Sequence, residues 1–357
     1  MIVGVIGGGQ LARMLAMAGH PWAQRFVFLD PAPDACAGPL GELITAPYDC
    51  ERSLLQLAER ADVVTFDFEN VPAASLEFLA GRVPVHPGAR ALGVAQDRLR
   101  EKALFRELGM ATAEFVAVAN GAALPAAVAE LGLPAILKTR TQGYDGKGQW
   151  LLRTAADVAV AGRELGATAA LLERLVVFAR EVSLVAARGR DGSVACYPLS
   201  ENVHRDGMLH TTLCRPDDPM QAAAEEQVCR LLDALDYVGV LAVEFFQVGD
   251  ALLANEWAPR VHNSGHWTIE GAETSQFENH LRAILGLPLG STRARGHYGM
   301  INLIGSVPEP ARVLAVPGAH LHDYGKAPRP GRKVGHITVA CSVPGVLPPE
   351  LLALAGC

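Results

Sequence analysis

The sequence predicts a protein of mixed α/β and α+β class, with an N-terminal parallel α/β layer followed by two α+β lobes. Over roughly the first ninety residues, short apolar runs alternate with segments of helical spacing, which is typical of a parallel sheet covered by helices. A second set of strand-like and helix-like segments begins near residue 111. A short link at 174–180 separates it from a third set that contains a β-hairpin. These breaks predict domains at 1–95, 96–178 and 179–357.

Composition narrows the class of protein further. Half of the 357 residues are hydrophobic and 19% are charged, which is typical of a globular chain with a large core. The net charge of -7 argues against a general nucleic-acid or membrane binder. The seven cysteines are odd in number and scattered, which indicates reduced thiols. No apolar run approaches the roughly 20 residues that span a bilayer, so we expect a soluble cytoplasmic protein.

The N-terminal layer is predicted from apolar periodicity. Strands are expected at 2–6, 25–30 and 61–66, and helices at 10–19 and 51–60. Gly7, Gly9 and Ala12, with Asp30 about twenty residues on, fit the fingerprint of a dinucleotide-binding turn. A glycine turn that merely joins a strand to a helix would look the same, so both interpretations stay open.

The remaining elements follow from the same reasoning. Asp67 and Glu69 come at the end of the third strand, where ligands collect in open α/β sheets, although solvent-facing acids would look alike. Apolar and helical patterns then predict strands at 113–118, 134–138, 170–173, 181–187, 240–248 and 251–257, and helices at 95–108, 124–131, 219–235 and 275–285.

A polar, glycine-rich segment follows Lys138. Three glycines in six residues deny the segment a stable helix or strand interior, and its lysines and backbone amides suit closure over phosphates. The segment lacks the spacing of a P-loop. A plain hairpin turn is the alternative, but it has no need of Lys138, Tyr144, Asp145 and Lys147 together.

The predicted hairpin at 240–257 carries two glutamates. If its loop has three residues, 249–251, then Glu244 lies directly opposite Glu256, on the face of Ala242, Phe246, Leu252 and Ala254. Two facing carboxylates repel, and a magnesium ion with an amide oxygen such as that of Asn263 would relieve the repulsion. A two-residue turn would put the glutamates on opposite faces, and this alternative stays open.

Two further polar clusters lie in the C-terminal half. The stretch 255–266 holds a carboxylate, a guanidinium, two imidazoles and two amides, more polar chemistry than a core strand requires. The segment 326–333 holds Lys326, Arg329, Arg332 and Lys333, which would suit a phosphate but also a solvated turn. His204, within 200–209, reads as a loop histidine.

The chain carries four motifs whose order resembles that of the ATP-grasp superfamily and, within it, of the 5-(carboxyamino)imidazole ribonucleotide synthases of purine biosynthesis. They are Gly-Gly-Gly-Gln-Leu-Ala-Arg-Met at 7–14, Gly-Tyr-Asp-Gly-Lys-Gly-Gln at 143–149, Asn-Glu-Trp-Ala-Pro-Arg-Val-His-Asn-Ser-Gly-His at 255–266 and Gly-Arg-Lys-Val-Gly-His at 331–336. The resemblance covers nearly the whole chain. It implies an ATP-grasp fold with a pre-ATP-grasp domain and a homodimer.

The resemblance also implies an activity and a site. ATP would activate bicarbonate as carboxyphosphate, and the exocyclic amine of 5-aminoimidazole ribonucleotide would attack it, with Mg²⁺ and without biotin. Nucleotide contacts would come from Arg98, Lys138, Gly143, Tyr144, Asp145, Gly146, Lys147, Gly148, Gln149, Glu173, Arg174, Leu175, Val176, Glu181, His204, Asn255 and Glu256. Substrate contacts would come from Gln10, Tyr144, Arg260, His262, Asn263, Lys326, Arg332 and Lys333. Glu244 and Glu256 would hold the metal, and Arg260, Asp145, Lys147 and His262 would be catalytic, with Asp145 or His262 accepting the amine proton.

Three positions depart from the family pattern, since Asp67 replaces Glu, Val261 replaces Pro and Trp257 replaces a smaller aliphatic residue. The shorter arm of Asp67 argues against direct substrate contact there. The rival functions are a sister ATP-grasp ligase, such as a formate-dependent glycinamide ribonucleotide transformylase, an NAD-dependent oxidoreductase that rests on the glycine turn alone, and a non-catalytic nucleotide-binding module.

Overall fold

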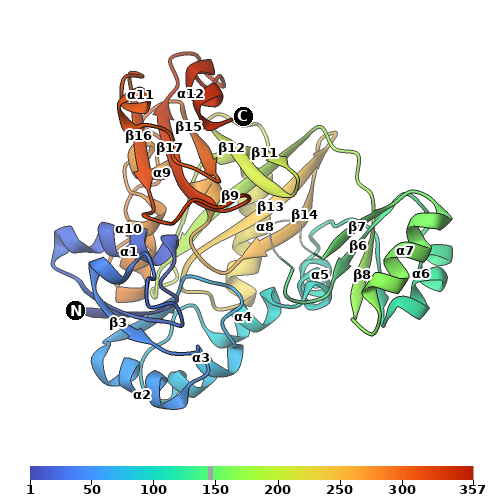
Figure 1. The fold of residues 1–357 in the computed structure, drawn as a ribbon, viewed down its shortest axis with the longest axis horizontal. Coiled ribbons are helices and arrows are strands. Elements are labelled where there is room, and N and C mark those ends of the chain that lie inside the picture. The colour runs from blue at the N-terminus through green and yellow to red at the C-terminus, as the bar shows by residue number, and fades with distance from the viewer. Residues whose placement is uncertain (144–147, 357) are drawn as a thin grey trace.

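The computed structural model describes residues 1–143 and 148–356 and contains three β-sheets (Figure 1). The N-terminal sheet is parallel, with strand order β3-β2-β1-β4. Its elements are β1 (Ile2–Ile6), α1 (Gln10–Gly19), β2 (Arg25–Asp30), β3 (Glu42–Thr45), α2 (Glu51–Arg60), β4 (Val63–Phe66) and α3 (Ala73–Ala80), with short 3-10 turns η1 (His20–Trp22) and η2 (Gly38–Leu40). The predicted parallel α/β layer is confirmed.

The helix predicted at 95–108 is confirmed as α5, but it begins three residues later than predicted. The structure has α4 (Ala89–Ala95) and α5 (Arg98–Glu107), separated at Asp97. The Asp97 carboxylate accepts the N–H groups of Leu99 and Arg100 at 3.0 and 3.4 Å, so it caps a new helix instead of continuing the old one. As a result, α5 begins with Arg98 at its first turn.

The small lobe is an antiparallel sheet with two helices on one face, and it stands to the right in Figure 1. Its elements are β5 (Phe115–Val118), η3 (Gly121–Ala123), α6 (Leu124–Leu131), β6 (Ala135–Thr139), β7 (Gln149–Leu152), α7 (Ala155–Leu165) and β8 (Ala170–Arg174), in strand order β5-β8-β6-β7. Its buried apolar side chains, among them Leu137 and Leu172, form a core of their own. The lobe is therefore packed independently of its neighbours.

The large lobe is built on a sheet with strand order β14-β13-β9-β11-β12-β15-β17-β16, and β10 pairs with β9. Its strands are β9 (Arg180–Arg188), β10 (Val194–Cys196), β11 (Leu199–Arg205), β12 (Met208–Arg215), β13 (Gly239–Val248), β14 (Ala251–Ala258), β15 (Tyr298–Ile304), β16 (Ala319–Asp323) and β17 (Lys333–Ala340). Its helices are α8 (Gln221–Ala234), η4 (Asn263–Gly265), α9 (Thr268–Gly271), α10 (Gln276–Leu285), α11 (Pro310–Leu314) and α12 (Pro349–Ala355). His204 lies on β11, so its prediction as a loop residue is wrong.

Helix α10 joins the large lobe to the N-terminal layer. Phe277 and Leu281 are buried in one cluster with Leu11 and Leu15 of α1, and Thr65 Oγ1 of β4 lies 2.9 Å from His280 Nε2. The N-terminal layer and the large lobe thus share a core, and the division into three domains stays a prediction. Within the described residues, no helix combines the length and the apolar character that crossing a membrane requires.

The register of the β13–β14 hairpin confirms one prediction and corrects another. Val248 pairs with Ala251, so the turn has two residues and the predicted three-residue loop is wrong. A β-bulge then shifts the register at Asn255, and Glu244 pairs with Glu256. Leu252 and Ala254 were predicted on the same face of the hairpin as the two glutamates. In the structure they are buried on the opposite face, together with Phe245. The bulge therefore brings the two carboxylates together.

Candidate active site

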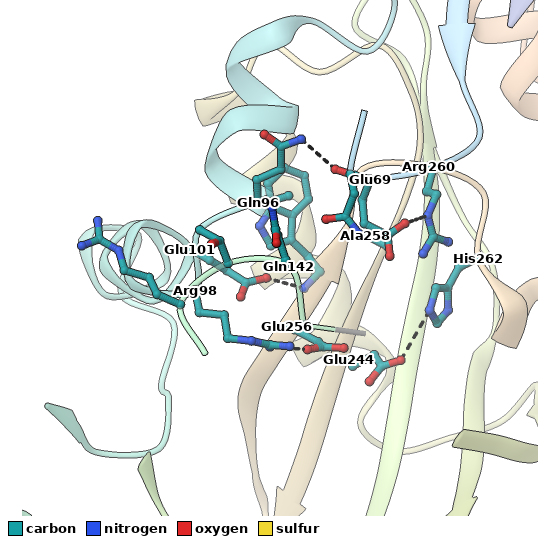
Figure 2. Close-up of a pocket in the computed structure, with 16 residues that line it drawn as sticks. Glu69, Gln96, Arg98, Glu101, Gln142, Glu244, Glu256, Ala258, Arg260 and His262 are labelled. Carbon is teal, nitrogen blue, oxygen red and sulfur yellow. Dashed lines mark hydrogen bonds and ion pairs between the residues drawn. The ribbon is translucent and has the colours of Figure 1, made fainter. Parts of the chain in front are cut away.

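A pocket opens where the N-terminal layer, α5, the small lobe and the β13–β14 hairpin meet (Figure 2). Its charged lining comes from segments far apart in the sequence: Glu69, Arg98, Glu101, Arg140, Glu244, Glu256, Arg260 and His262. Gly143 contributes to the same lining. Five of these residues, Arg98, Glu244, Glu256, Arg260 and His262, were predicted as site residues, so the structure brings the central predicted groups together.

The two hairpin glutamates differ in charge state. Burial and the neighbouring charge of Glu256 raise the pKa of Glu244 to about 7. Desolvation acts to raise the pKa of Glu256 as well, but Arg98 and Lys138 outweigh it and hold that pKa at about 2. Arg98 Nη1 lies 2.8 Å from Glu256 Oε2. At neutral pH Glu256 is therefore ionised and paired with Arg98, while Glu244 is partly protonated.

A third carboxyl group, Glu101, lies beside this pair and was not predicted. Its side chain is buried, and Oε1 accepts the Trp257 N–H at 2.7 Å. Burial and Glu256 raise the pKa of Glu101 to about 8. At neutral pH the protonated form of Glu101 therefore predominates, and it adds little negative charge to the pocket.

A buried cluster of two lysines and one carboxylate lies at the base of the small lobe. Glu173 Oε1 is 2.8 Å from Lys102 Nζ, and Glu173 Oε2 forms an ion pair with Lys138. All three side chains are buried. Burial acts to raise the pKa of Glu173, but Lys138 and Lys102 outweigh it and hold the pKa at about 2. Glu173 is therefore shared by two lysines, one of which is the predicted nucleotide contact Lys138.

Arg260 and His262 extend from the loop after β14 toward the pocket. Arg260 Nε donates to Glu69 Oε2, and His262 Nε2 lies 3.4 Å from Glu244 Oε1 (Figure 2). Burial and the charges of Arg260 and Lys333 lower the pKa of His262 to about 3. The side-chain amide of Asn263 is buried, and neither of its polar atoms has a hydrogen-bond partner among the described residues. Asn263 is not among the residues that line the pocket.

The glycine turn before α1 is filled by the protein's own carboxylates. Asp30 Oδ2 accepts the Gly8 N–H at 2.7 Å, and Asp67 Oδ2 accepts the Ala12 N–H at 3.2 Å. A Cβ atom at Gly7, where φ is +107°, would lie 1.7 Å from Asp67 Oδ1. The helix N-terminus that would hold a pyrophosphate is thus occupied, which argues against the dinucleotide interpretation.

Asp67 is the position where the sequence departs from the family pattern. Burial raises its pKa to about 6 despite the backbone N–H groups of Ala12 and Gly9 that it accepts. The carboxylate contacts the turn itself, while Glu69 two residues later reaches the pocket. Glu69 was singled out at the strand end in the sequence but given no role.

The residues predicted to bind substrate form a second group near the glycine turn. Lys326 Nζ donates to Gln10 Oε1, which joins the C-terminal segment to α1 across 316 residues. Burial is the main cause that lowers the pKa of Lys326, and the positive charges of Arg332 and Lys333 lower it further. The three cations therefore lie near one another. The charge of Lys333 also acts to lower the pKa values of Glu244 and His262. Lys333 therefore links this second group of residues to the central pocket.

The predicted adenine and ribose contacts lie at the seam between the lobes. His204 Nδ1 pairs with Glu181, and the pKa of His204 is raised because that carboxylate and Glu244 outweigh burial. Leu175 N–H donates to Pro134 O at 3.2 Å, and Arg174 Nε donates to Glu114 Oε2 at 2.6 Å. Leu175 and Val176 are half-buried. This seam is separate from the lining of the central pocket.

The glycine-rich loop is described only in part. Tyr144, Asp145, Gly146 and Lys147 lie outside the described residues. On either side of them, Gly143 reaches the pocket and Gln149 begins β7. Gly148 has φ +69°, and its carbonyl accepts the Thr139 N–H at 2.8 Å.

The donor set was tested for a fit to Mg²⁺. Over residues 1–143 and 148–356, no group of three or more His, Cys, Asp or Glu side chains is arranged to hold a metal ion. The facing carboxylates of Glu244 and Glu256 supply two oxygen ligands, and the Asn263 amide has no partner among the described residues. Mg²⁺ usually binds one or two carboxylates, with waters and substrate phosphates completing the shell, so the residues fit this ion when a nucleotide is bound.

Comparison with known families supports this geometry. The chain matches the ribonucleotide synthetase preATP-grasp domain over residues 1–96, the ATP-grasp domain over 103–277 and the phosphoribosylaminoimidazole carboxylase C-terminal domain over 299–343. It is 58% identical to the N5-carboxyaminoimidazole ribonucleotide synthase of Pseudomonas aeruginosa, over 96% of this chain and 95% of the relative.

Solved structures are similar over the same length. The N5-carboxyaminoimidazole ribonucleotide synthetase of Thermus thermophilus has a TM-score of 0.91 and 56% identity, with 96% of this chain and 94% of that chain covered. The Aspergillus clavatus N5-carboxyaminoimidazole synthase, in complex with ADP and 5-aminoimidazole ribonucleotide, has a TM-score of 0.88 and 32% identity, with 95% and 93% covered.

Proposed function

The chain belongs to the N5-carboxyaminoimidazole ribonucleotide synthases, a family of ATP-grasp ligases, and from that membership we propose its substrates, its metal and the roles of its residues. The enzyme carboxylates the exocyclic amine of 5-aminoimidazole ribonucleotide with ATP, in purine biosynthesis. Bicarbonate is the carbon source, and carboxyphosphate is the intermediate. The observation that carries the proposal is the register of Glu244 and Glu256 in a pocket beside Arg98 and Arg260.

On the nucleotide side, each proposed contact has a physical role. Adenine binds against the backbone of 173–176 at the lobe seam, with Glu181 near the ribose. Arg98 and Lys138 contact phosphates, together with His204 and residues of the segment 143–149. Because Arg98 and Lys138 are ion-paired to carboxylates in the ligand-free protein, they are held in position before ATP arrives.

Glu244 and Glu256 would hold Mg²⁺ when the nucleotide is bound, and the ion would supply neutralisation of charge on the transferred phosphoryl group. Glu101 lies next to them in its protonated form and does not add to the negative charge. Asn255 forms the bulge that sets the register of Glu256. The bulge therefore contributes to activity by positioning a carboxylate.

On the substrate side, the polar and charged residues form two sets, each proposed to bind a different part of the substrates. Lys326, Arg332 and Lys333 bind the 5'-phosphate of the ribonucleotide, with Gln10 holding Lys326. Arg260, His262 and Asn263 face bicarbonate and the aminoimidazole. Bicarbonate is a poor electrophile, so its conversion to carboxyphosphate needs charge neutralisation more than covalent catalysis. Carboxyphosphate also hydrolyses readily, so the pocket must exclude water before the amine attacks.

We also propose that the enzyme is a cytoplasmic homodimer without biotin, as the family resemblance implies. None of these three features carries the assignment of the reaction.

Phosphate release from ATP is the direct test. We expect release that requires both 5-aminoimidazole ribonucleotide and bicarbonate, and a carboxylated product trapped from labelled bicarbonate. Replacing the pair with glycinamide ribonucleotide and formate should give no turnover. Turnover with that second pair, but not with the first, would overturn the proposal in favour of the formate-dependent ligase.

A further inference from the structure

A row of buried hydroxyl and amide groups runs beneath His262. It consists of Thr212 on β12, Asn202 on β11, Ser183 on β9 and Ser264 on η4. Consecutive members are 2.9, 2.9 and 2.7 Å apart, and Ser264 Oγ lies 2.8 Å from His262 Nδ1. All four side chains are buried, Asn202 being the most exposed at 5%. The row therefore ends on the ring nitrogen that faces away from the pocket.

The direction of these hydrogen bonds follows from one backbone group. The Ser264 N–H points at His262 Nδ1, at a distance of 3.3 Å. A backbone N–H can only donate, so Nδ1 carries a lone pair and no proton. The Ser264 hydroxyl, which lies nearer to the same nitrogen, donates its proton there as well.

The remaining directions follow in turn. Because Ser264 Oγ uses its proton on Nδ1, it accepts from the Ser183 hydroxyl. Ser183 Oγ then accepts from Asn202 Nδ2, which turns Asn202 Oδ1 toward the Thr212 hydroxyl. Reversing one member would leave two donors or two acceptors facing each other in a buried layer, which costs about 1–3 kcal/mol for each unsatisfied group. The row is thus ordered in one direction.

We infer that Thr212, Asn202, Ser183 and Ser264 fix His262 as the tautomer with its proton on Nε2. His262 then donates a hydrogen bond into the pocket, where Nε2 lies 3.4 Å from Glu244 Oε1, and presents no lone pair there. It is not the base that takes the proton of the attacking amine, a role that the sequence left open between Asp145 and His262. This inference rests on the proposed function only for the acceptor, an oxygen of bicarbonate or carboxyphosphate.

The four residues of the row act through His262, so they are positioning residues. Their common effect is to hold the imidazole ring with its Nε2–H toward the oxygen on which charge develops, a donor arrangement that needs no reorganisation during the reaction. In the ligand-free protein, Nε2 lies 3.4 Å from Glu244 Oε1, on the side of the ring that faces the pocket.

Nitrogen-15 NMR of histidine-labelled protein tests the tautomer without any substrate. The His262 signals, assigned by their loss in His262→Gln, should show an unprotonated Nδ1 and a proton coupled to Nε2. The opposite assignment, a proton on Nδ1, would overturn the inference whether or not the protein turns over 5-aminoimidazole ribonucleotide. Conversely, a protein without that turnover but with a protonated Nε2 would contradict the proposed function alone.

Two pairs of variants test the role. Glutamine can present an N–H near the position of Nε2 but cannot act as a base, so His262→Gln should keep a kcat at least about tenfold above that of His262→Ala. Equal kcat values would overturn the donor role. Ser264→Ala should lower kcat by roughly tenfold and disturb the His262 nitrogen signals. Ser200→Ala removes a hydroxyl from the same layer that does not touch the ring, and it should leave those signals unchanged. A disturbance of equal size in Ser200→Ala would contradict the proposed row.

Discussion

Two carboxylate sites, one buried in the small lobe and one on the partly exposed hairpin of the large lobe, are treated by the protein in opposite ways. At the base of the small lobe, Glu173 is held between Lys102 and Lys138, so the charge of this carboxylate is matched by cations of the protein itself. On the hairpin of the large lobe, Glu244 faces Glu256, and Arg98 is the one cation within salt-bridge distance of the pair among the described residues. The pKa of Glu173 is held at about 2, whereas the pKa of Glu244 is raised to about 7.

This difference separates a site that is complete in the protein from a site that needs a ligand. Removing the carboxylate from between two buried lysines would leave their charges uncompensated, which is strongly destabilising. Two facing carboxylates reduce stability unless a cation joins them. The hairpin is thus under electrostatic strain in the ligand-free protein, and the strain would be relieved when metal and nucleotide bind.

The largest expected effect is on stability, at the small-lobe cluster. Glu173→Gln should lower the free energy of unfolding by about 3–5 kcal/mol, because it leaves two lysines buried without a counter-charge. Urea unfolding without nucleotide measures this. Glu278→Gln, which removes an i,i+4 pair with Arg282 on α10, is the control and should cost well under 1 kcal/mol. Equal losses of stability in the two variants would contradict the claim that Glu173 compensates two buried charges.

At the hairpin, the expected effect is on turnover and not on folding. Glu256→Gln should lower kcat by about 10²–10³-fold, because a ligand of the metal and its charge are lost, while the folded state is kept. Steady-state phosphate release and circular dichroism together measure this. Near-normal turnover in this variant would instead favour a non-catalytic nucleotide-binding module.

A smaller effect is expected on the pH dependence of the free energy of unfolding, which should have opposite signs for Glu244 and Glu173. The folded-state pKa of Glu244 lies above its ordinary value of 4.5, so without metal its contribution to stability is lost as pH rises from 4.5 through about 7. The folded-state pKa of Glu173 lies below 4.5, so its contribution is lost as pH falls from 4.5 toward 2.

Unfolding free energies measured in chelator across pH 5–8 test this contrast. Glu244→Gln should remove a decline in stability of at most about 1.4 kcal/mol per pH unit over that range. Glu173→Gln should leave the slope in the same range unchanged. Glu101 and Asp67, whose pKa values are raised to about 8 and about 6, keep their own decline in this variant, so an unchanged slope would contradict the role of Glu244.

Much of this architecture was predictable from local patterns. Apolar runs and glycine stops give the bounds of β1, β2, α1 and α2 as the structure has them. The capping aspartate at 97 is also visible in the sequence, yet the predicted start of this helix lies two residues before it. The pairing of Glu244 with Glu256 was predicted for the wrong reason, because a bulge at Asn255 and not a longer loop produces it.

What the sequence could not give are contacts between distant segments. Glu69 meets Arg260 across 191 residues, and the row beneath His262 takes its members from three strands and a turn. Neither pairing has a local pattern, because each depends on which strands become neighbours in the sheet. The charge states of Glu101 and Glu244 follow from the same packing, since burial decides both.

The central claim is that the hairpin carboxylates form a magnesium site completed by the nucleotide. Calorimetric binding of ADP, with and without Mg²⁺, tests it most directly, with wild-type protein and Glu256→Gln side by side. We predict that Mg²⁺ tightens ADP binding to the wild type by at least about tenfold, or roughly 1.4 kcal/mol, and that Glu256→Gln loses this enhancement. An equal enhancement in both proteins would contradict the claim.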